Sequence, residues 1–495
     1  MRKTGKEQEL LARVEEIIAA GPYAPTWQSL MQSQVPGWFR QRKLGIFIHW
    51  GVYSVPAKFH EWYSRNMYIK DSPEWQYHRD TYGPQDRFGY KDFIPMFRAE
   101  KFDPSEWMAL FRAAGAGYVF PVAEHHDGFQ MYKSELSEWN AAEMGPRRDV
   151  LGELKQAAQA QGLEFCTSSH RAEHWFFMGH GKEFPSDIHD PMVKGDFYWP
   201  AMPEPDNQAL SSQPMPTEEY LNDWLARTAE IILNYQPSLL YFDWWIQHTA
   251  FKPYLKKLAA FYYNCGVRWG RPVQICYKHD AMMFGTGIVE IERGSFREAK
   301  PFPWQTDTAV ARNSWCYTDS LDYKTGREII TTLVDVVSKG GNLLLNIGPK
   351  ADGTIPDGDR KILEDLAGWM RINREAIDGA IPWRQSQEGP TVHEEGQFQD
   401  GRETVYTCED FRFTAANGAI YAIALAASGD GRYTVRSLAD SSDPNRPNFH
   451  GVLKSVEILG YPAGDIRWSK DKEGLHVSAP GLKSEFPIVI KAMMA

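Results

Sequence analysis

The sequence predicts an α/β protein in which a (β/α)8-like barrel of the TIM type is followed by a C-terminal antiparallel β-sandwich. Short apolar runs alternate with helical patterns from about Trp38 to Ile381, and five of these runs end in a histidine or a carboxylate. After Pro382 the pattern changes to short strands separated by Gly, Asp and Pro. Because 495 residues exceed one ordinary core, we expect two domains, a barrel with an N-terminal helix at 1–384 and a sandwich at 385–495.

Helices are expected where capping residues precede apolar periodicity. An N-terminal amphipathic helix extends to about Ala20, and further helices are expected at 103–114, 149–162, 217–235, 327–339 and 357–377. The helix at 103 opens with Asp103-Pro104, a cap followed by proline in the first turn, and the helix at 149 ends at Gly162. Strands that alternate with helices in this way predict a parallel sheet.

A doubly wound sheet is the alternative to a barrel. It lacks support, because no strand is followed by a GxGxxG or GxxxxGK[ST] loop. Residues 342–348 (NLLLNIG) give a strong buried-strand pattern. Short strands at 420–425, 452–459 and 486–490 then predict the small C-terminal sandwich.

Composition limits the class of partner. A net charge of -10 and a pI of about 5.8 argue against nucleic acid or an anionic membrane and favour a neutral or cationic substrate. No run approaches the roughly 20 apolar residues that span a membrane. The aromatic share of 14%, with 18 Trp, suggests a site that stacks flat apolar faces.

Cysteine usage and the N-terminus bear on localisation. Five scattered cysteines without a CxxC spacing indicate a reducing compartment. The first residues contain no apolar core of signal-peptide length, so we expect a cytoplasmic protein unless a leader was removed. Oligomeric state does not follow from the sequence.

Candidate functional residues come directly after the apolar runs. The runs at 45–48, 118–123, 163–169, 239–242 and 287–289 lead respectively to His49, to His125 and His126, to His170, to Asp243, and to Glu290 and Glu292. Since barrels build their sites at the C-terminal ends of strands, we expect these side chains to surround one pocket.

Two of these endings supply the carboxyl pair that glycoside hydrolysis requires. Asp243, followed by two tryptophans, is either a helix cap or salt-bridged residue, or a carboxylate nucleophile in an aromatic setting. The second carboxyl is Glu290 or Glu292, which share one face of a strand. The end of the strand favours Glu292, the last carboxylate before Gly294.

The histidines permit two hypotheses. A metal-dependent barrel hydrolase would use His49, His125, His126, His170 and Asp243. Adjacent histidines on a strand face opposite ways, however, and neither HxH nor HExxH occurs at 125–126. Imidazoles that bind sugar hydroxyls fit better, because each neutral ring supplies one donor and one acceptor. A catalytically silent carbohydrate-binding protein is a third class, but it would need neither carboxylate.

Six motifs together resemble the α-L-fucosidases of glycoside hydrolase family 29. They are GIFIHWG at 45–51, EWY at 61–63, HHDGF at 125–129, SEWN at 137–140, YFD at 241–243 and GGNLLLNIGP at 340–349. The motifs occur in the family's order and span roughly residues 35–385, the whole predicted barrel.

The resemblance implies an irregular barrel and retaining hydrolysis of a fucosylated oligosaccharide or glycoconjugate, without metal or organic cofactor. It implies Asp243 as nucleophile and Glu292 as acid/base. Trp315 matches the aromatic that packs on the sugar methyl group. The positions that match hydroxyl-binding residues are His49, Glu61, Trp62, His125 and His126. Where many relatives have Tyr-Tyr-Ser, this chain has Ser168-Ser169-His170, so His170 is expected to take over a hydroxyl contact or leave it unmade.

Overall fold

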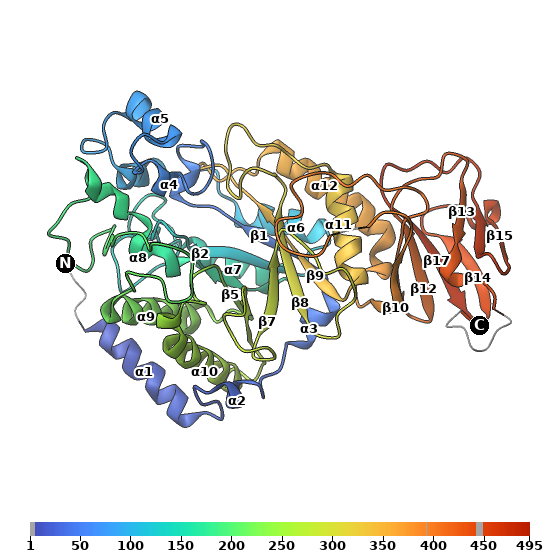
Figure 1. The fold of residues 1–495 in the computed structure, drawn as a ribbon, viewed down its shortest axis with the longest axis horizontal. Helices are drawn as coiled ribbons and strands as arrows, with labels where there is room; N and C mark the ends of the chain where they lie inside the picture. Colours follow the sequence, from blue (N-terminus) through green and yellow to red (C-terminus); the bar gives the residue numbers. More distant parts are fainter. Residues whose placement is uncertain (1–4, 393, 442–448) are drawn as a thin grey trace.

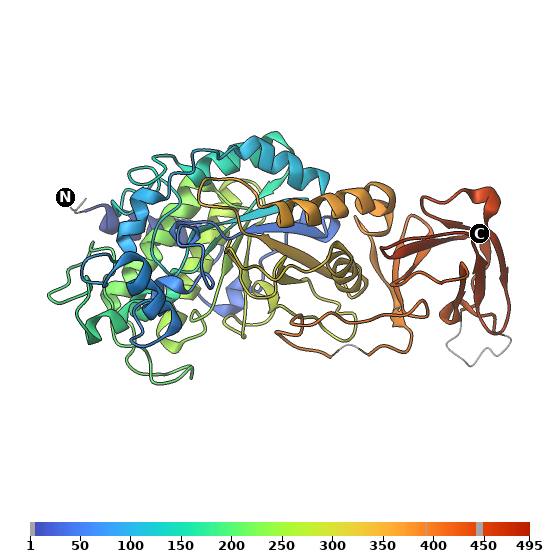
Figure 2. The same cartoon turned by 90° about the horizontal axis from the view of Figure 1, so that it is seen from above.

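The computed structural model describes residues 5–392, 394–441 and 449–495. Its fold has two parts, a parallel barrel that contains the N-terminal region and a pair of antiparallel sheets at the opposite end of the molecule (Figures 1 and 2).

The barrel is closed and entirely parallel. Its strands follow the order β1-β9-β8-β7-β6-β5-β4-β2-β3, and pairing of β1 with β2 closes the ring. Because β3 and β4 are two pieces of one strand that both pair with β2, the ring has eight positions. The strands are β1 (Leu44–Ile48), β2 (Tyr118–Glu124), β3 (Glu164–Phe165), β4 (Thr167–Ser169), β5 (Leu239–Phe242), β6 (Gln274–Tyr277), β7 (Ile288–Glu292), β8 (Trp304–Ala309) and β9 (Gly341–Ile347). The predicted barrel is confirmed.

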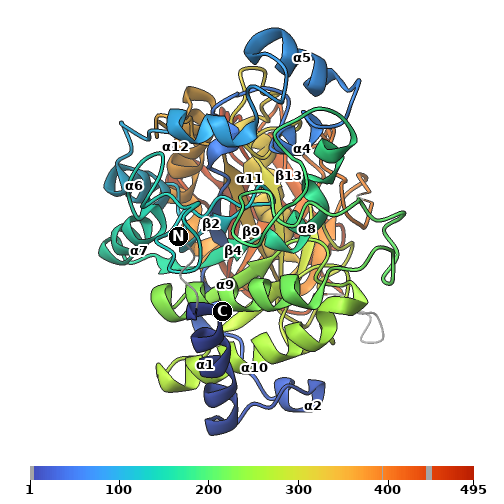
Figure 3. The same cartoon turned by 90° about the vertical axis from the view of Figure 1, so that its left-hand side faces the viewer.

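Six long helices pack around this barrel. They are α6 (Pro104–Ala113), α7 (Val150–Ala160), α9 (Glu218–Tyr235), α10 (Lys252–Arg268), α11 (Gly326–Ser338) and α12 (Asp357–Asn373). The predicted cap is present, since the Asp103 carboxylate accepts hydrogen bonds from the amides of Ser105 and Glu106. Helix α1 (Lys6–Ala20) buries Val14 and Ile17 in the core that α9 and α10 share (Figure 3).

Other α-helices lie in some of the remaining connections. They are α2 (Trp27–Leu30), α3 (Gly37–Gln41), α4 (Tyr63–Asn66), α5 (Pro73–Tyr82) and α8 (His174–Phe177). By contrast, β6–β7 and β7–β8 are joined by loops at 278–287 and 293–303, and these described residues contain no helix. The barrel is therefore irregular on this side.

The interior of the barrel is partly polar. Gln305 on β8 donates to Glu290 on β7 at 2.5 Å and accepts from the Tyr118 hydroxyl at 2.5 Å. Tyr241 donates to Asp307 at 2.7 Å. Burial, together with Asp307, raises the pKa of Glu290 well above its ordinary value, so this carboxyl is neutral. These hydrogen bonds satisfy one oxygen of each carboxyl, which would otherwise be costly to bury. The other oxygens, Glu290 Oε2 and Asp307 Oδ1, have no hydrogen-bond partner among the described residues.

Two antiparallel sheets face each other in the C-terminal part. One has the order β10-β11-β12-β17-β14 and the other β13-β16-β15. Phe413 and Ile490 of the first sheet share a core with Tyr433 and Val477 of the second. The strands are β10 (Ile381–Glu388), β11 (Phe411–Ala416), β12 (Ala419–Ala424), β13 (Arg432–Val435), β14 (Leu453–Ile458), β15 (Arg467–Lys470), β16 (Leu475–Ser478) and β17 (Ile488–Met494). The predicted antiparallel sandwich is confirmed.

The outer face of the five-stranded sheet rests on the barrel. Arg412 on β11 forms a buried ion pair with Asp335 on α11 at 2.5 Å, and Trp369 on α12 donates to the carbonyl of Pro487 at 2.8 Å. The C-terminal sheets therefore contact the barrel through helices α11 and α12.

Two further features concern the environment of the chain. All five cysteines carry free thiols, and the expected cytoplasmic location stays a prediction. In the described ranges, no helix combines the length and apolar character needed to cross a membrane.

Candidate active site

A pocket lies at the C-terminal ends of the barrel strands. It encloses about 250 Å³, and every residue favoured for the site from sequence lines it. The lining residues are Phe47, His49, Glu61, Trp62, His125, His126, His170, Glu173, Gln208, Tyr241, Asp243, Trp244, Trp245, Lys278, Glu292, Asp307, Trp315 and Phe398. Glu290 does not line it. The side chains predicted from the strand ends therefore line one cavity.

Asp243 follows β5 and is surrounded by nitrogen atoms. Its Oδ1 accepts from the Lys278 ammonium at 3.0 Å, while Oδ2 lies 3.1 Å from Nδ1 of His170 and 3.4 Å from Nε2 of His126. Burial alone would raise the pKa of Asp243, but Lys278 and the two histidines hold it well below its ordinary value. Asp243 is therefore a carboxylate.

Lys278, which follows β6, bridges the carboxyls of Asp243 and Glu292. Its Nζ also donates to Oε2 of Glu292 at 2.7 Å. Burial opposes the charge, but Asp243, Asp307 and Glu292 raise the pKa of Lys278 well above its ordinary value. The indole of Trp244 donates to the same Glu292 oxygen at 3.0 Å.

The shared ammonium also limits the separation of the carboxyls. The Asp243 and Glu292 oxygens that it binds cannot be farther apart than the sum of its two hydrogen bonds, about 5.7 Å. Glu290 lies two residues earlier on β7, and its side chain bonds to Gln305 in the barrel interior. The strand end thus places Glu292 in the pocket and Glu290 below it.

A chain of hydrogen bonds fixes the wall formed by His49 and Trp315. Nδ1 of His49 donates to the side-chain oxygen of Asn346 at 2.6 Å, and the Asn346 amide donates to the Trp315 carbonyl at 2.6 Å. The Trp315 amide donates to Glu61 at 3.0 Å. Burial and His170 lower the pKa of His49, so its ring is neutral and its Nε2 is an acceptor.

The other three histidines have different charges. Burial lowers the pKa of His125 and of His170, so both are neutral. Burial also disfavours charge on His126, but Glu173 and Asp243 raise its pKa to about 9. His126 is therefore an imidazolium, and its Nδ1 donates to the carbonyl of His170 at 2.8 Å.

The expectation that His125 and His126 face opposite ways is wrong. Both line the pocket, and their ring centroids lie 4.3 Å apart. The physical reason is that β2 ends at Glu124, so the alternation of a strand no longer applies to the next two residues. The objection that this alternation raised against a metal therefore falls away.

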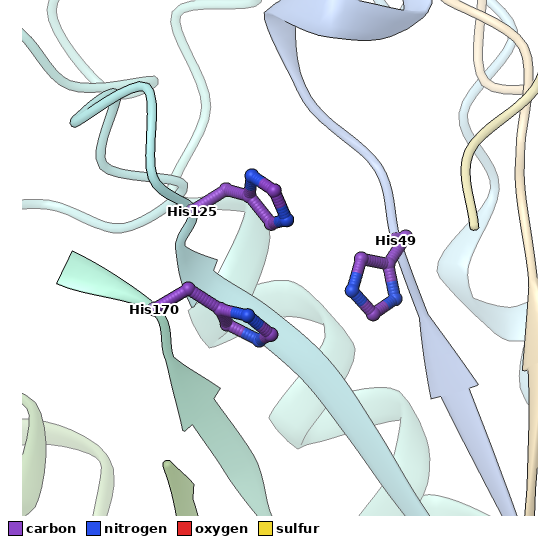
Figure 4. Close-up of side chains that lie close together, drawn as sticks. All are labelled: His49, His125 and His170. Carbon is purple, nitrogen blue, oxygen red and sulfur yellow. The ribbon is translucent and has the colours of Figure 1, made fainter. Parts of the chain in front are cut away.

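Two groups in the pocket have the composition of a metal site. His49, His125 and His170 converge from three strand ends (Figure 4), and His126, His170 and Asp243 form the second group. Both include His170, whose Nδ1 bonds to Asp243 and whose Nε2 bonds to Ser168 Oγ at 3.0 Å. A metal ligated by His170 would have to displace one of these bonds.

Sequence reasoning missed several residues of the site. Lys278 directly follows the short strand QICY, so the strand-end rule applied to it as well. Asp307 lies within β8 and Asn346 within β9, so neither residue follows the end of a strand. Phe398, from the C-terminal part of the chain, carried no local signal.

A closed barrel with two carboxyls, neutral imidazoles and indole rings around one pocket is typical of a glycoside hydrolase. Residues 10–375 match the family model described as Alpha-L-fucosidase. The chain belongs to the α-L-fucosidase family, glycoside hydrolase family 29, and acts on fucosylated glycans.

Individual relatives agree with this assignment. The chain is 31% identical to tissue alpha-L-fucosidase of Homo sapiens over 95% of its own length and 91% of the relative's. It is 32% identical to the plasma enzyme of the same species over 75% of each. The Thermotoga maritima alpha-fucosidase solved in complex with fucose superposes with a TM-score of 0.72 at 28% identity, covering 95% of this chain and 100% of that one.

Proposed function

We propose that this α-L-fucosidase hydrolyses terminal α-L-fucosides with retention, through a covalent fucosyl–enzyme intermediate on Asp243. The observation that carries the proposal is the bound of about 5.7 Å on the separation of the Asp243 and Glu292 oxygens. Retaining glycosidases hold their carboxyls about 5–5.5 Å apart, whereas inverting enzymes leave about 6.5–9.5 Å for a water.

Asp243 and Glu292 have complementary roles in this reaction. The Asp243 carboxylate attacks the anomeric carbon while Glu292 gives its proton to the departing oxygen. Glu292 then takes a proton from water, which attacks the anomeric carbon and releases Asp243. Since Lys278 and Trp244 both donate to Oε2 of Glu292, we assign the transferable proton to Oε1.

The remaining lining residues suit one fucose ring. Neutral His49 offers the acceptor Nε2 to a hydroxyl group, because its Nδ1 donates to Asn346. Neutral His125 offers one donor and one acceptor. Trp315 provides a flat apolar face for the methyl group. The fucose complex of the Thermotoga maritima relative supports this sugar. We assign the other hydroxyl contacts to Glu61, Trp62 and His126. Both ring nitrogens of His170 are already hydrogen-bonded, to Ser168 and to Asp243, so the hydroxyl contact expected for His170 requires the loss of one of these bonds.

A metal-dependent hydrolase is the second candidate, because three histidines converge on one point (Figure 4). The two hydrogen bonds of His170 count against it. Activity that survives chelation separates the candidates.

Replacement of Lys278 tests the proposed role of Asp243. Lys278 is the largest of the charges that lower the pKa of Asp243. Lys278→Met therefore raises that pKa, and we expect the acidic limb of the kcat/KM–pH profile to move to higher pH. The limb moves to higher pH because only the ionised carboxylate of Asp243 attacks, and a raised pKa requires a higher pH to ionise it.

The control is Lys278→Arg, which keeps the positive charge and should leave the limb close to its original position. An acidic limb that stays in place in Lys278→Met would contradict the role assigned to Asp243.

A further inference from the structure

A segment of the C-terminal part returns to the barrel between β10 and β11. We call residues 394–400 the return segment. Gly396 and Ser295 exchange two backbone hydrogen bonds of 3.1 and 3.2 Å. The next contacts are also between main chains, since the amide of Phe398 donates to the carbonyl of Glu292 at 2.9 Å. The segment is thereby fixed to the chain that carries the proposed acid/base residue.

Side chains strengthen this attachment. Asp400 forms an ion pair with Lys324, accepts from Thr308 and lies 3.4 Å from Arg293. Burial opposes its charge, but Lys324 and Arg293 lower the pKa of Asp400, which is ionised. Gly294 permits the close approach, because a Cβ there would lie 1.8 Å from the Gly396 carbonyl oxygen.

The return segment places Phe398 at the rim of the pocket. The ring lies 6.3 Å from that of Trp244 with an angle of 33° between their planes, and His279 contacts Trp244 at 4.4 Å. Phe398 remains 53% exposed, so its ring is not part of a core. Both Phe398 and His279 have positive φ, 55° and 50°. A bulky residue such as Phe398 rarely adopts this backbone region without a constraint.

We propose that Trp244, His279 and Phe398 form the binding site for the leaving group, and that this site accepts a neutral ring with a flat apolar face, a hexose or an aryl group. The inference rests on the proposed function, because Glu292 must protonate the oxygen that joins fucose to its leaving group. Trp244 bonds to Glu292 directly, so the leaving group departs beside these rings. Aromatic faces stack on the C–H face of a sugar or on an aryl ring.

Phe398→Ala tests the site with three substrates: a fucosyl-hexose disaccharide, an aryl α-L-fucoside and α-L-fucosyl fluoride, whose leaving group has no ring. We expect kcat/KM on the first two to fall by about 10-fold more than on the fluoride, the scale of one lost aromatic contact. Phe398→Tyr keeps the ring and should keep most of the activity on all three.

The matched control is Phe284→Ala. Phe284 is similarly exposed, at 56%, but packs on Phe302 and does not line the pocket. It should show no preference among the substrates. Equal losses on all three substrates in Phe398→Ala, or none, would overturn the leaving-group site and leave the fucosidase mechanism standing. A parent enzyme that hydrolyses none of them would instead contradict the proposed function.

The double variant Phe398→Ala/Asp400→Asn tests whether the return segment acts by placing the ring. Asp400→Asn weakens the ion pair with Lys324 and should by itself reproduce the substrate-selective loss. Once the Phe398 ring is absent, Asp400→Asn should add little to the difference in kcat/KM loss among the three substrates. If the substrate-selective losses of kcat/KM in the two single variants multiply in the double variant, Phe398 and the attachment by Asp400 act independently, and the return segment does not act by placing the ring.

Discussion

We expect Asp243→Gly to lose about 10⁴-fold or more of its kcat/KM on an aryl α-L-fucoside, because the variant lacks the group that bonds to the anomeric carbon. Azide should restore part of the activity by entering the space left by the carboxylate. The product is then β-L-fucosyl azide, since azide attacks from the face that Asp243 occupied. The measurement is the rate with and without azide, together with NMR of the product.

Asp307→Gly is the control for this experiment. It also removes a buried carboxyl near Lys278, at 3.7 Å, but from a position that we do not assign to the anomeric carbon. Azide should not restore its activity or yield a fucosyl azide. Turnover by Asp243→Gly at nearly the parent rate would eliminate Asp243 as the nucleophile.

The second large effect concerns Glu292→Gln. General acid catalysis contributes about 10²–10⁴-fold, and mainly for leaving groups that need a proton. We therefore expect a loss of that size on a fucosyl disaccharide and a much smaller loss of the first step on an aryl fucoside with an acidic phenol. Steady-state kinetics over a series of aryl leaving groups, plotted against their pKa, measures the difference.

Glu290→Gln is a matched control on the same strand. Its side chain is neutral and bonded to Gln305 below the pocket, so its loss should be similar for all leaving groups. A steep dependence on the leaving group in Glu290→Gln, and not in Glu292→Gln, would transfer the acid/base role to Glu290.

The pocket at the C-terminal end of the barrel could be predicted because several strands are apolar and end abruptly. The runs before His49 and Asp243 are buried at every position, so their ends are visible in the sequence. Strand β8 gives no such signal, because Gln305 and Asp307 point to hydrogen-bond partners inside the barrel. An apolar run is typical only of strands whose neighbours are apolar on both faces.

Other features of the site depend on where a strand ends and on contacts between residues far apart in the sequence, which no local sequence pattern contains. The alternation of side chains along a strand could not show which of Glu290 and Glu292 lines the pocket, because both point to the same face of β7. They differ only in how far along β7 they lie. The wrong expectation for His125 and His126 has the same origin, since it required knowing that β2 ends at Glu124. Phe398 reaches the pocket because main-chain hydrogen bonds join its segment to Glu292 and Ser295, which lie far earlier in the chain.

The most direct test of the mechanism is the configuration of the first fucose released. Proton NMR of the parent enzyme acting on an aryl α-L-fucoside, in the presence of EDTA, resolves the anomers before mutarotation mixes them. The double displacement on Asp243 predicts undiminished activity and α-L-fucose as the first product. β-L-Fucose would contradict the covalent mechanism, and loss of activity to the chelator would favour a metal at the histidines.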